Sequence, residues 1–228
     1  MGTMIVVATY LVVAAFYLRL GTHALRLWEA ARRAPTTTRP GGAEKLRSAG
    51  SALADVLLLR RLFVVNPALW LGEWVFHASL FLVLVRHLRY FMQQVPPWLV
   101  WAQTPGWMAG FLLPLAVLYV LAVRLLTRRE QYSSPVNLLL LLDVLAIAAT
   151  GLLLATRHRV DLVQVKAYAL GTVTFRPAQP PADWLLTAHL ALVMALVLYV
   201  PSHVFTAPLT LLDARQRDLE RVRMLHDA

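Results

Sequence analysis

The fold is decided by residues 66–91, which read NPALWLGEWVFHASLFLVLVRHLRYF. An α-helix rises about 1.5 Å per residue, so about 20 apolar residues cross the ~30 Å hydrocarbon core of a membrane. This stretch is long and apolar enough, and it carries two histidines, His77 and His87. An ionisable side chain within hydrocarbon is unfavourable and usually functional. The stretch therefore predicts a membrane span that carries chemistry.

A second stretch, residues 183–205, has the same character and reads DWLLTAHLALVMALVLYVPSHVF. It carries His189 and His203, at a spacing of ~21 Å along a helix, against ~15 Å for the first pair. If the two spans are antiparallel, His87 meets His189 near the outer surface, and His77 meets His203 nearer the cytoplasm. Helix tilt of ~20° absorbs part of the mismatch. The four residues predict two b-type haems, one above the other, each with two axial imidazoles.

Composition agrees with a membrane protein. The chain is 59% hydrophobic and 15% charged, whereas soluble domains are about 25% charged. It has no cysteine, which excludes disulfides, iron–sulfur clusters and covalent c-type haem within this chain, so a redox centre must be held by His or Met. The net charge of +10 lies in the loops between apolar windows, which indicates membrane orientation and no nucleic-acid partner.

Windows long and apolar enough to cross the membrane predict an all-α integral membrane protein, a five-helix bundle in one domain over residues 1–228. The first window has no basic residue before it and no small-x-small cleavage site after it, so we expect a retained span. Proline and glycine mark the window boundaries. The five windows lie near residues 3–20, 68–91, 106–126, 136–156 and 183–205.

Basic residues in the loops predict the orientation. Segment 21–65 carries eight, segment 124–135 three and segment 204–228 four, whereas the opposite side carries five. The positive-inside bias then places the N-terminus outside and the C-terminal tail, residues 206–228, in the cytoplasm.

Two segments between the windows have helical patterns. Within the cytoplasmic loop 21–65, residues 43–63 alternate polar and leucine faces, which predicts an amphipathic helix on the membrane surface. Residues 160–175 predict a similar helix outside. An ordinary connecting loop is the alternative for both.

Arginines flank one of the predicted ligands. Arg86 and Arg89 lie on either side of His87, and a guanidinium suits a carboxylate. We expect them to bind the propionates of the outer haem or, equally, to reach the lipid headgroups.

Other polar side chains in or near the spans have simpler expected roles. Glu73 and Asp143 are acids in the cytoplasmic half of their spans, and we expect Asp143 to pair with Arg124 at the same depth. A lone histidine within a span commonly forms a hydrogen bond between helices, and only the matched depths favour ligation for the four above. Solvated surface histidines are expected at positions 23, 158 and 226.

These features resemble a known family. Five spans, an outside N-terminus, the segment GEWVFHASLFLVLVRH and a histidine pair in the last span resemble the gamma subunit family of respiratory nitrate reductase, a membrane di-haem cytochrome b. The segments DVLLLRRLFVVNPALWLGEWVFH and VDLVQVKAYALGTVTF are similar to its heterodisulfide-reductase-like and sulfite-reductase-linked branch. The resemblance covers most of the chain beyond residue 50. In the family the last histidine lies further along, whereas here it follows Pro201-Ser202 directly, and the quinone-site lysine has no counterpart near residues 93–107.

The resemblance implies an oxidoreductase subunit in a bacterial or archaeal cytoplasmic (inner) membrane. Quinol from the quinone pool would be oxidised near the outer haem, and electrons would pass through the inner haem to a cytoplasmic iron–sulfur or molybdoenzyme subunit. Two alternatives are a mono-haem cytochrome, with His87 and His189 as ligands, and a haem-free scaffold or transporter subunit. The polar candidates for the quinone site are Arg86, Arg89, Tyr90 and Gln93.

Overall fold

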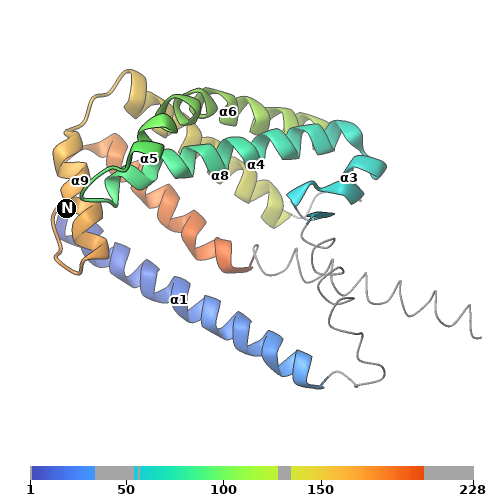
Figure 1. Ribbon diagram of the computed structural model, residues 1–228, viewed down its shortest axis with the longest axis horizontal. Coiled ribbons are helices and arrows are strands. Elements are labelled where there is room, and N and C mark those ends of the chain that lie inside the picture. The colour runs from blue at the N-terminus through green and yellow to red at the C-terminus, as the bar shows by residue number, and fades with distance from the viewer. Residues whose placement is uncertain (1, 34–53, 56, 128–134, 203–228) are drawn as a thin grey trace, which may run out of the picture.

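The computed structural model describes residues 2–33, 54–55, 57–127 and 135–202. Helices and turns, without a strand, make up these described residues. Five helices are long and apolar enough to cross a membrane, which confirms an all-α multi-pass membrane protein (Figure 1). The candidate spans are Gly2–Arg26, Pro67–Tyr90, Gln103–Leu126, Pro135–Thr156 and Trp184–Ser202.

The helix bounds agree with the predicted windows except at the first. Helix α1 continues to Arg33, beyond the predicted end at residue 20, because Ala, Leu and Arg in residues 21–33 are strong helix formers. A helix is present within residues 160–175, as predicted, and is α9; its outer location stays a prediction. Most of the predicted amphipathic segment 43–63 lies outside the described residues. The labelled helices are α1 (Gly2–Arg33), α3 (Arg60–Val65), α4 (Pro67–His87), η1 (Leu88–Tyr90), α5 (Pro97–Trp101), α6 (Gln103–Leu126), α8 (Pro135–Thr156) and α9 (Leu162–Val173).

Local sequence signals set where two of these helices begin. The Asn66 side chain accepts a hydrogen bond from the Leu69 amide at 2.9 Å, and Pro67 takes the first position of α4. Asp161 caps α9 in the same way, accepting from the Val163 amide at 2.9 Å. A polar cap satisfies amides that have no partner within the helix, and proline at the first position loses no hydrogen bond.

The core lies where α4, α6 and α8 meet. Close approach of α4 and α6 depends on a glycine from each helix: a Cβ at Gly72 would lie 2.6 Å from Cδ1 of Tyr119, and a Cβ at Gly106 would lie 2.7 Å from Cβ of Arg86. Small residues allow such close packing of membrane helices. The buried core residues are Leu69, Phe76, Leu113, Ala116, Val117, Val120, Leu121, Leu141, Val144 and Ala148.

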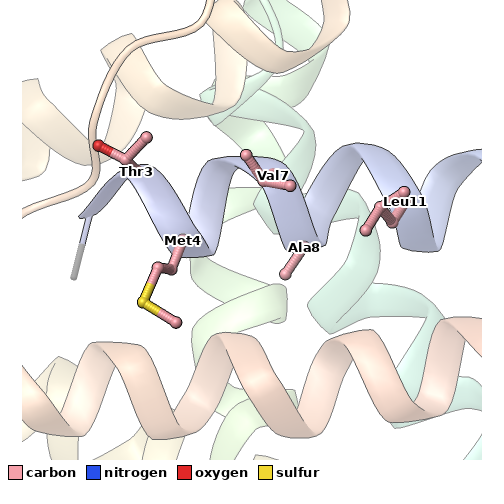
Figure 2. Close-up of a pocket in the computed structure, with 5 residues that line it drawn as sticks. All are labelled: Thr3, Met4, Val7, Ala8 and Leu11. Carbon is pink, nitrogen blue, oxygen red and sulfur yellow. The ribbon is translucent and has the colours of Figure 1, made fainter.

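Helix α1 lies along the side of this bundle (Figure 1). No residue in its most apolar stretch is buried. Its polar contacts include Thr9 Oγ1 with the Tyr168 hydroxyl of α9, at 2.5 Å, and Arg19 Nη1, which donates to the Leu198 carbonyl at 2.7 Å. An open apolar recess of about 340 Å³ follows the N-terminal part of α1, lined by Thr3, Met4, Val7, Ala8 and Leu11 (Figure 2).

Candidate functional site

The structure places three of the four predicted ligands. His77 and His87 lie on α4, and His189 lies on the helix Trp184–Ser202. His203 lies outside the described residues, so the predicted inner pair of His77 and His203 stays a prediction. Both residues of the predicted outer pair are described: His87 ends α4, and His189 lies in the first turns of the last helix. That they hold one iron between them stays a prediction.

The two histidines of α4 are oriented by their own helix. Nδ1 of His87 lies 2.7 Å from the Val83 carbonyl oxygen, and Nδ1 of His77 lies 2.7 Å from the Glu73 carbonyl oxygen. A carbonyl oxygen only accepts hydrogen bonds, so Nδ1 carries the proton in both neutral rings. The lone pair is then on Nε2.

His189 is oriented by a different helix. Its Nδ1 lies 2.9 Å from Oγ1 of Thr150 on α8. The next residue, Gly151, contacts the same ring, because a Cβ at that position would lie 3.1 Å from the His189 Cε1 atom. These two residues could not be predicted from the sequence, because a threonine and a glycine in a leucine-rich helix are compatible with any packing role.

These three rings suit ligation of iron. A metal-binding histidine normally donates its other ring N–H to an acceptor, which fixes the tautomer and the ring orientation. All three have their Nδ1 engaged in this way, and the hydrogen bonds of the described residues do not use their Nε2 atoms. The described residues hold no group of three or more His, Cys, Asp or Glu side chains. A bis-imidazole haem needs only two protein ligands, so the outer pair fits this group.

Arg89 is fixed beside the outer pair. Its guanidinium donates to Oε1 of Gln103 at 3.0 Å and to the Tyr90 hydroxyl at 2.6 Å, while its Nε is buried without a hydrogen-bond partner among the described residues. Arg86 packs with its Cβ against Gly106. Both arginines are close enough to His87 to act on it electrostatically. The expected basic surroundings of His87 are therefore present.

Two further residues contact this region and were not predicted as site residues from the sequence. Lys166 of α9 donates from Nζ to the Gln93 carbonyl oxygen at 3.1 Å, and Gln103 at the start of α6 holds Arg89. The Gln93 side chain itself is exposed. Lys166 and Gln93 are far apart in the sequence, so the contact between the Lys166 ammonium group and the Gln93 backbone can be seen only in the structure.

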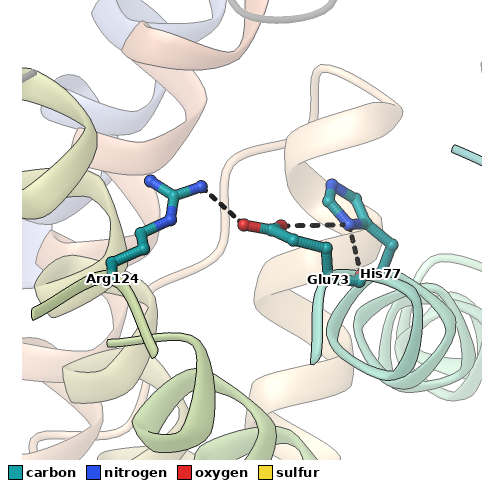
Figure 3. Close-up of polar contacts among 3 residues, drawn as sticks. All are labelled: Glu73, His77 and Arg124. Atoms are coloured by element: carbon teal, nitrogen blue, oxygen red, sulfur yellow. Dashed lines mark hydrogen bonds and ion pairs between the residues drawn. The ribbon is translucent and has the colours of Figure 1, made fainter. Parts of the chain in front are cut away.

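A buried ion pair lies one helical turn from His77 (Figure 3). Arg124 Nη2 donates to Oε1 of Glu73 at 2.5 Å, and Oε2 of the same carboxylate lies 3.7 Å from Nδ1 of His77. The expected pairing of Arg124 with Asp143 is wrong. Helix α6 packs closely on α4, and this packing puts the Arg124 guanidinium within reach of Glu73.

A second polar contact joins α8 to the last helix at the opposite end. Nε2 of His158 lies 2.5 Å from Oδ2 of Asp183, whose Oδ1 accepts from the Leu186 amide at 2.8 Å. The His158 side chain is 40% exposed, as expected for a histidine at a span end, and it also contacts Asp183. The helix amide and then the His158 contact hold the pKa of Asp183 below its usual range.

Comparison with known proteins gives two relatives. One is the "Hdr-like menaquinol oxidoreductase cytochrome b-like subunit" of Archaeoglobus profundus, 32% identical over 58% of this chain and 44% of the relative. The protein of the same name from Archaeoglobus fulgidus is 29% identical over 58% of this chain and 45% of the relative. The match thus spans less than half the length of these curated relatives. Their names support the Hdr-like cytochrome b branch of the resemblance, and neither is a nitrate reductase gamma subunit. No family model and no solved structure matches the chain.

Proposed function

We propose that this chain is a cytochrome b-like membrane subunit of a quinol-oxidising complex, with one haem b between His87 and His189 and a second between His77 and His203. The observation that carries the proposal is that the three described rings form the same kind of hydrogen bond. In each ring Nδ1 is engaged, which leaves Nε2 as the ligating atom. The names of the two relatives, which combine menaquinol oxidation with a cytochrome b-like subunit, support it.

The absorption spectrum and haem content of the purified protein test this proposal. We expect a Soret band and two haems per chain. One haem per chain would favour the mono-haem alternative with His87 and His189 as ligands. Absence of a Soret band in protein purified from haem-replete cells would leave the haem-free scaffold or transporter.

The chain's own residues bind and orient the reactants. Bound haem would supply one-electron transfer, and two axial imidazoles favour this over oxygen chemistry. Two electrons and two protons leave each quinol; the protons are released outside, and the electrons pass toward the cytoplasmic side. The partner there is an iron–sulfur or molybdoenzyme subunit, covering the basic loop 21–65 and the tail, in a bacterial or archaeal cytoplasmic membrane.

Quinol is proposed to react beside the outer pair. Arg89, held by Tyr90 and Gln103, is a cationic donor next to His87, and Arg86 lies on the same turn of the chain. A cation at this position can hold a quinone oxygen or a haem propionate. Tyr90 and Gln93 complete the candidate set, and Lys166 lies over Gln93.

Removing one arginine charge should slow the entry of electrons. We expect Arg86→Gln or Arg89→Gln to slow haem reduction by a quinol analogue about tenfold, because a hydrogen bond from a charged group contributes ~1.5 kcal/mol or more. Re-oxidation by the cytoplasmic partner should be nearly unchanged. Stopped-flow spectra measure both rates, and a redox titration detects a shift in haem potential.

Arg159→Gln is the matched control. It also removes a positive charge, but from an exposed residue that follows the end of α8. It should leave both rates as in the wild type. Normal quinol-driven reduction in both Arg86→Gln and Arg89→Gln, with haem content intact, would move the quinone site elsewhere.

The proposed orientation is open to labelling. With the N-terminus outside, a cysteine introduced at Gln179, an exposed residue of the outer loop, should react with an impermeant thiol reagent in intact cells. A cysteine at Thr37, which lies outside the described residues, should react only after the membrane is disrupted. The chain has no cysteine of its own, so the unsubstituted chain itself takes up no label. Reversed accessibility would invert the assignment of the outer and inner haems.

A further inference from the structure

The His189 ring differs from the other two in how it is held. His77 and His87 each donate to a carbonyl four residues earlier on α4. His189 instead meets a side chain of the neighbouring helix, Thr150 of α8. Its orientation therefore depends on contact between two helices, and a substitution in α8 can change it without touching the ligand itself.

The direction of this hydrogen bond follows from the other contacts of Thr150. Its Oγ1 lies 2.7 Å from the Ala146 carbonyl oxygen and 3.1 Å from the Ile147 carbonyl oxygen. A hydroxyl has one hydrogen, and these backbone acceptors take it. Oγ1 is then placed to accept a hydrogen bond from Nδ1–H of His189, at 2.9 Å, beside the Ile147 backbone, which is a further hydrogen-bond partner of this ring. Thr150 thereby selects the tautomer with its lone pair on Nε2.

Gly151 sets the position of the same ring. A Cβ there would lie 3.1 Å from Cε1, 3.7 Å from Nδ1 and 4.0 Å from Nε2 of His189. The Cε1 edge of the ring thus faces the glycine. In a helix interior alanine is more favourable than glycine, so an alanine here would favour α8 locally while pushing the imidazole away.

We propose that Thr150 and Gly151 are positioning residues that set the tautomer, the orientation and the donor strength of His189 as an axial ligand of the outer haem. The inference rests on the proposed function. An acceptor on Nδ1–H makes the imidazole a stronger donor, which stabilises the oxidised iron and lowers its potential. With haem bound, Thr150 would hold the outer haem at a lower potential than an unsupported His189 would.

The test uses the full chain with its complex in native membranes. Thr150→Val keeps the shape of the side chain and removes the acceptor. We expect an upward shift in the midpoint potential of one haem, or its loss through an affinity lowered about tenfold or more. Thr150→Ser restores the acceptor and should return both properties toward the wild type. Thr156→Val is the matched control, because Thr156 also donates to its own helix, at 2.7 Å to the Leu152 carbonyl oxygen, and among the described residues no hydrogen bond joins it to a histidine.

Gly151→Ala gives a second readout that does not require loss of a hydrogen bond. We expect altered low-spin ferric g-values for one haem, whereas Gly110→Ala of α6, where a Cβ would meet no atom within 4 Å, should leave the spectrum unchanged. Wild-type potentials in Thr150→Val together with wild-type g-values in Gly151→Ala would overturn the inference. A full haem complement in His189→Ala would instead overturn the proposed function, so the two failures are distinguishable.

Discussion

Alanine at His87 or at His189 is expected to remove one and the same haem, completely in each case. One iron needs both axial nitrogens, and the proposed outer haem takes one from His87 on α4 and one from His189 on the last helix. The stoichiometry should fall from two haems per chain to one in either variant. Low-temperature absorption spectra and redox titration identify which haem remains.

His158→Ala is the control for this experiment. His158 lies at the end of α8 and pairs with Asp183, so its removal should leave both haems in place. If His87→Ala and His189→Ala lost spectroscopically different haems, the pairing across the two helices would be wrong.

Breaking the ion pair between Glu73 and Arg124 should have the largest effect on stability. Glu73 is 7% exposed, and removing one partner of a buried pair typically costs about 3–5 kcal/mol, because the other charge is left uncompensated. We expect Glu73→Leu or Arg124→Leu to lower the free energy of unfolding in detergent by this order. The double variant should recover much of the loss, since it buries no charge.

The exposed pair of Arg60 and Asp55 serves as the comparison. Its atoms are 3.9 Å apart and the Arg60 side chain is 62% exposed, and exposed pairs contribute only ~0–1 kcal/mol. Arg60→Leu should therefore change stability little. Additive losses in the Glu73→Leu/Arg124→Leu double variant would contradict a direct interaction between these two residues.

The spans could be predicted because hydrocarbon imposes a length and a composition on each of them. Asn66 and Pro67 marked the start of α4 in the sequence, and the same local signals act in the structure. The pairing of Arg124 could not be predicted from depth alone, because Glu73 and Asp143 both lie in the expected half of their spans. Which acid it meets depends on which helix packs closest to α6, and that is decided by Gly72 and Gly106.

The histidines of the candidate site could be predicted from the sequence, whereas the residues that orient them could not. Histidines in apolar helices are rare enough to be noticed in one sequence. Thr150 and Gly151 are ordinary residues for a membrane helix, and their role follows only from the rotation of α8 against the last helix. Lys166 and Gln103 were missed for the same reason.

Helix α4 has a consequence for how fast charge can cross the membrane. His77 and His87 belong to one unbroken helix, so the distance between their levels, ~15 Å, is set by covalent geometry. Gly72 and Gly106 hold this helix against α6 near both ends, where sliding would drive Tyr119 or Arg86 into backbone. The proposed electron path therefore has a constant length. The rate of electron transfer is then controlled at the two ends of this path, where quinol delivers electrons and where the partner subunit accepts them.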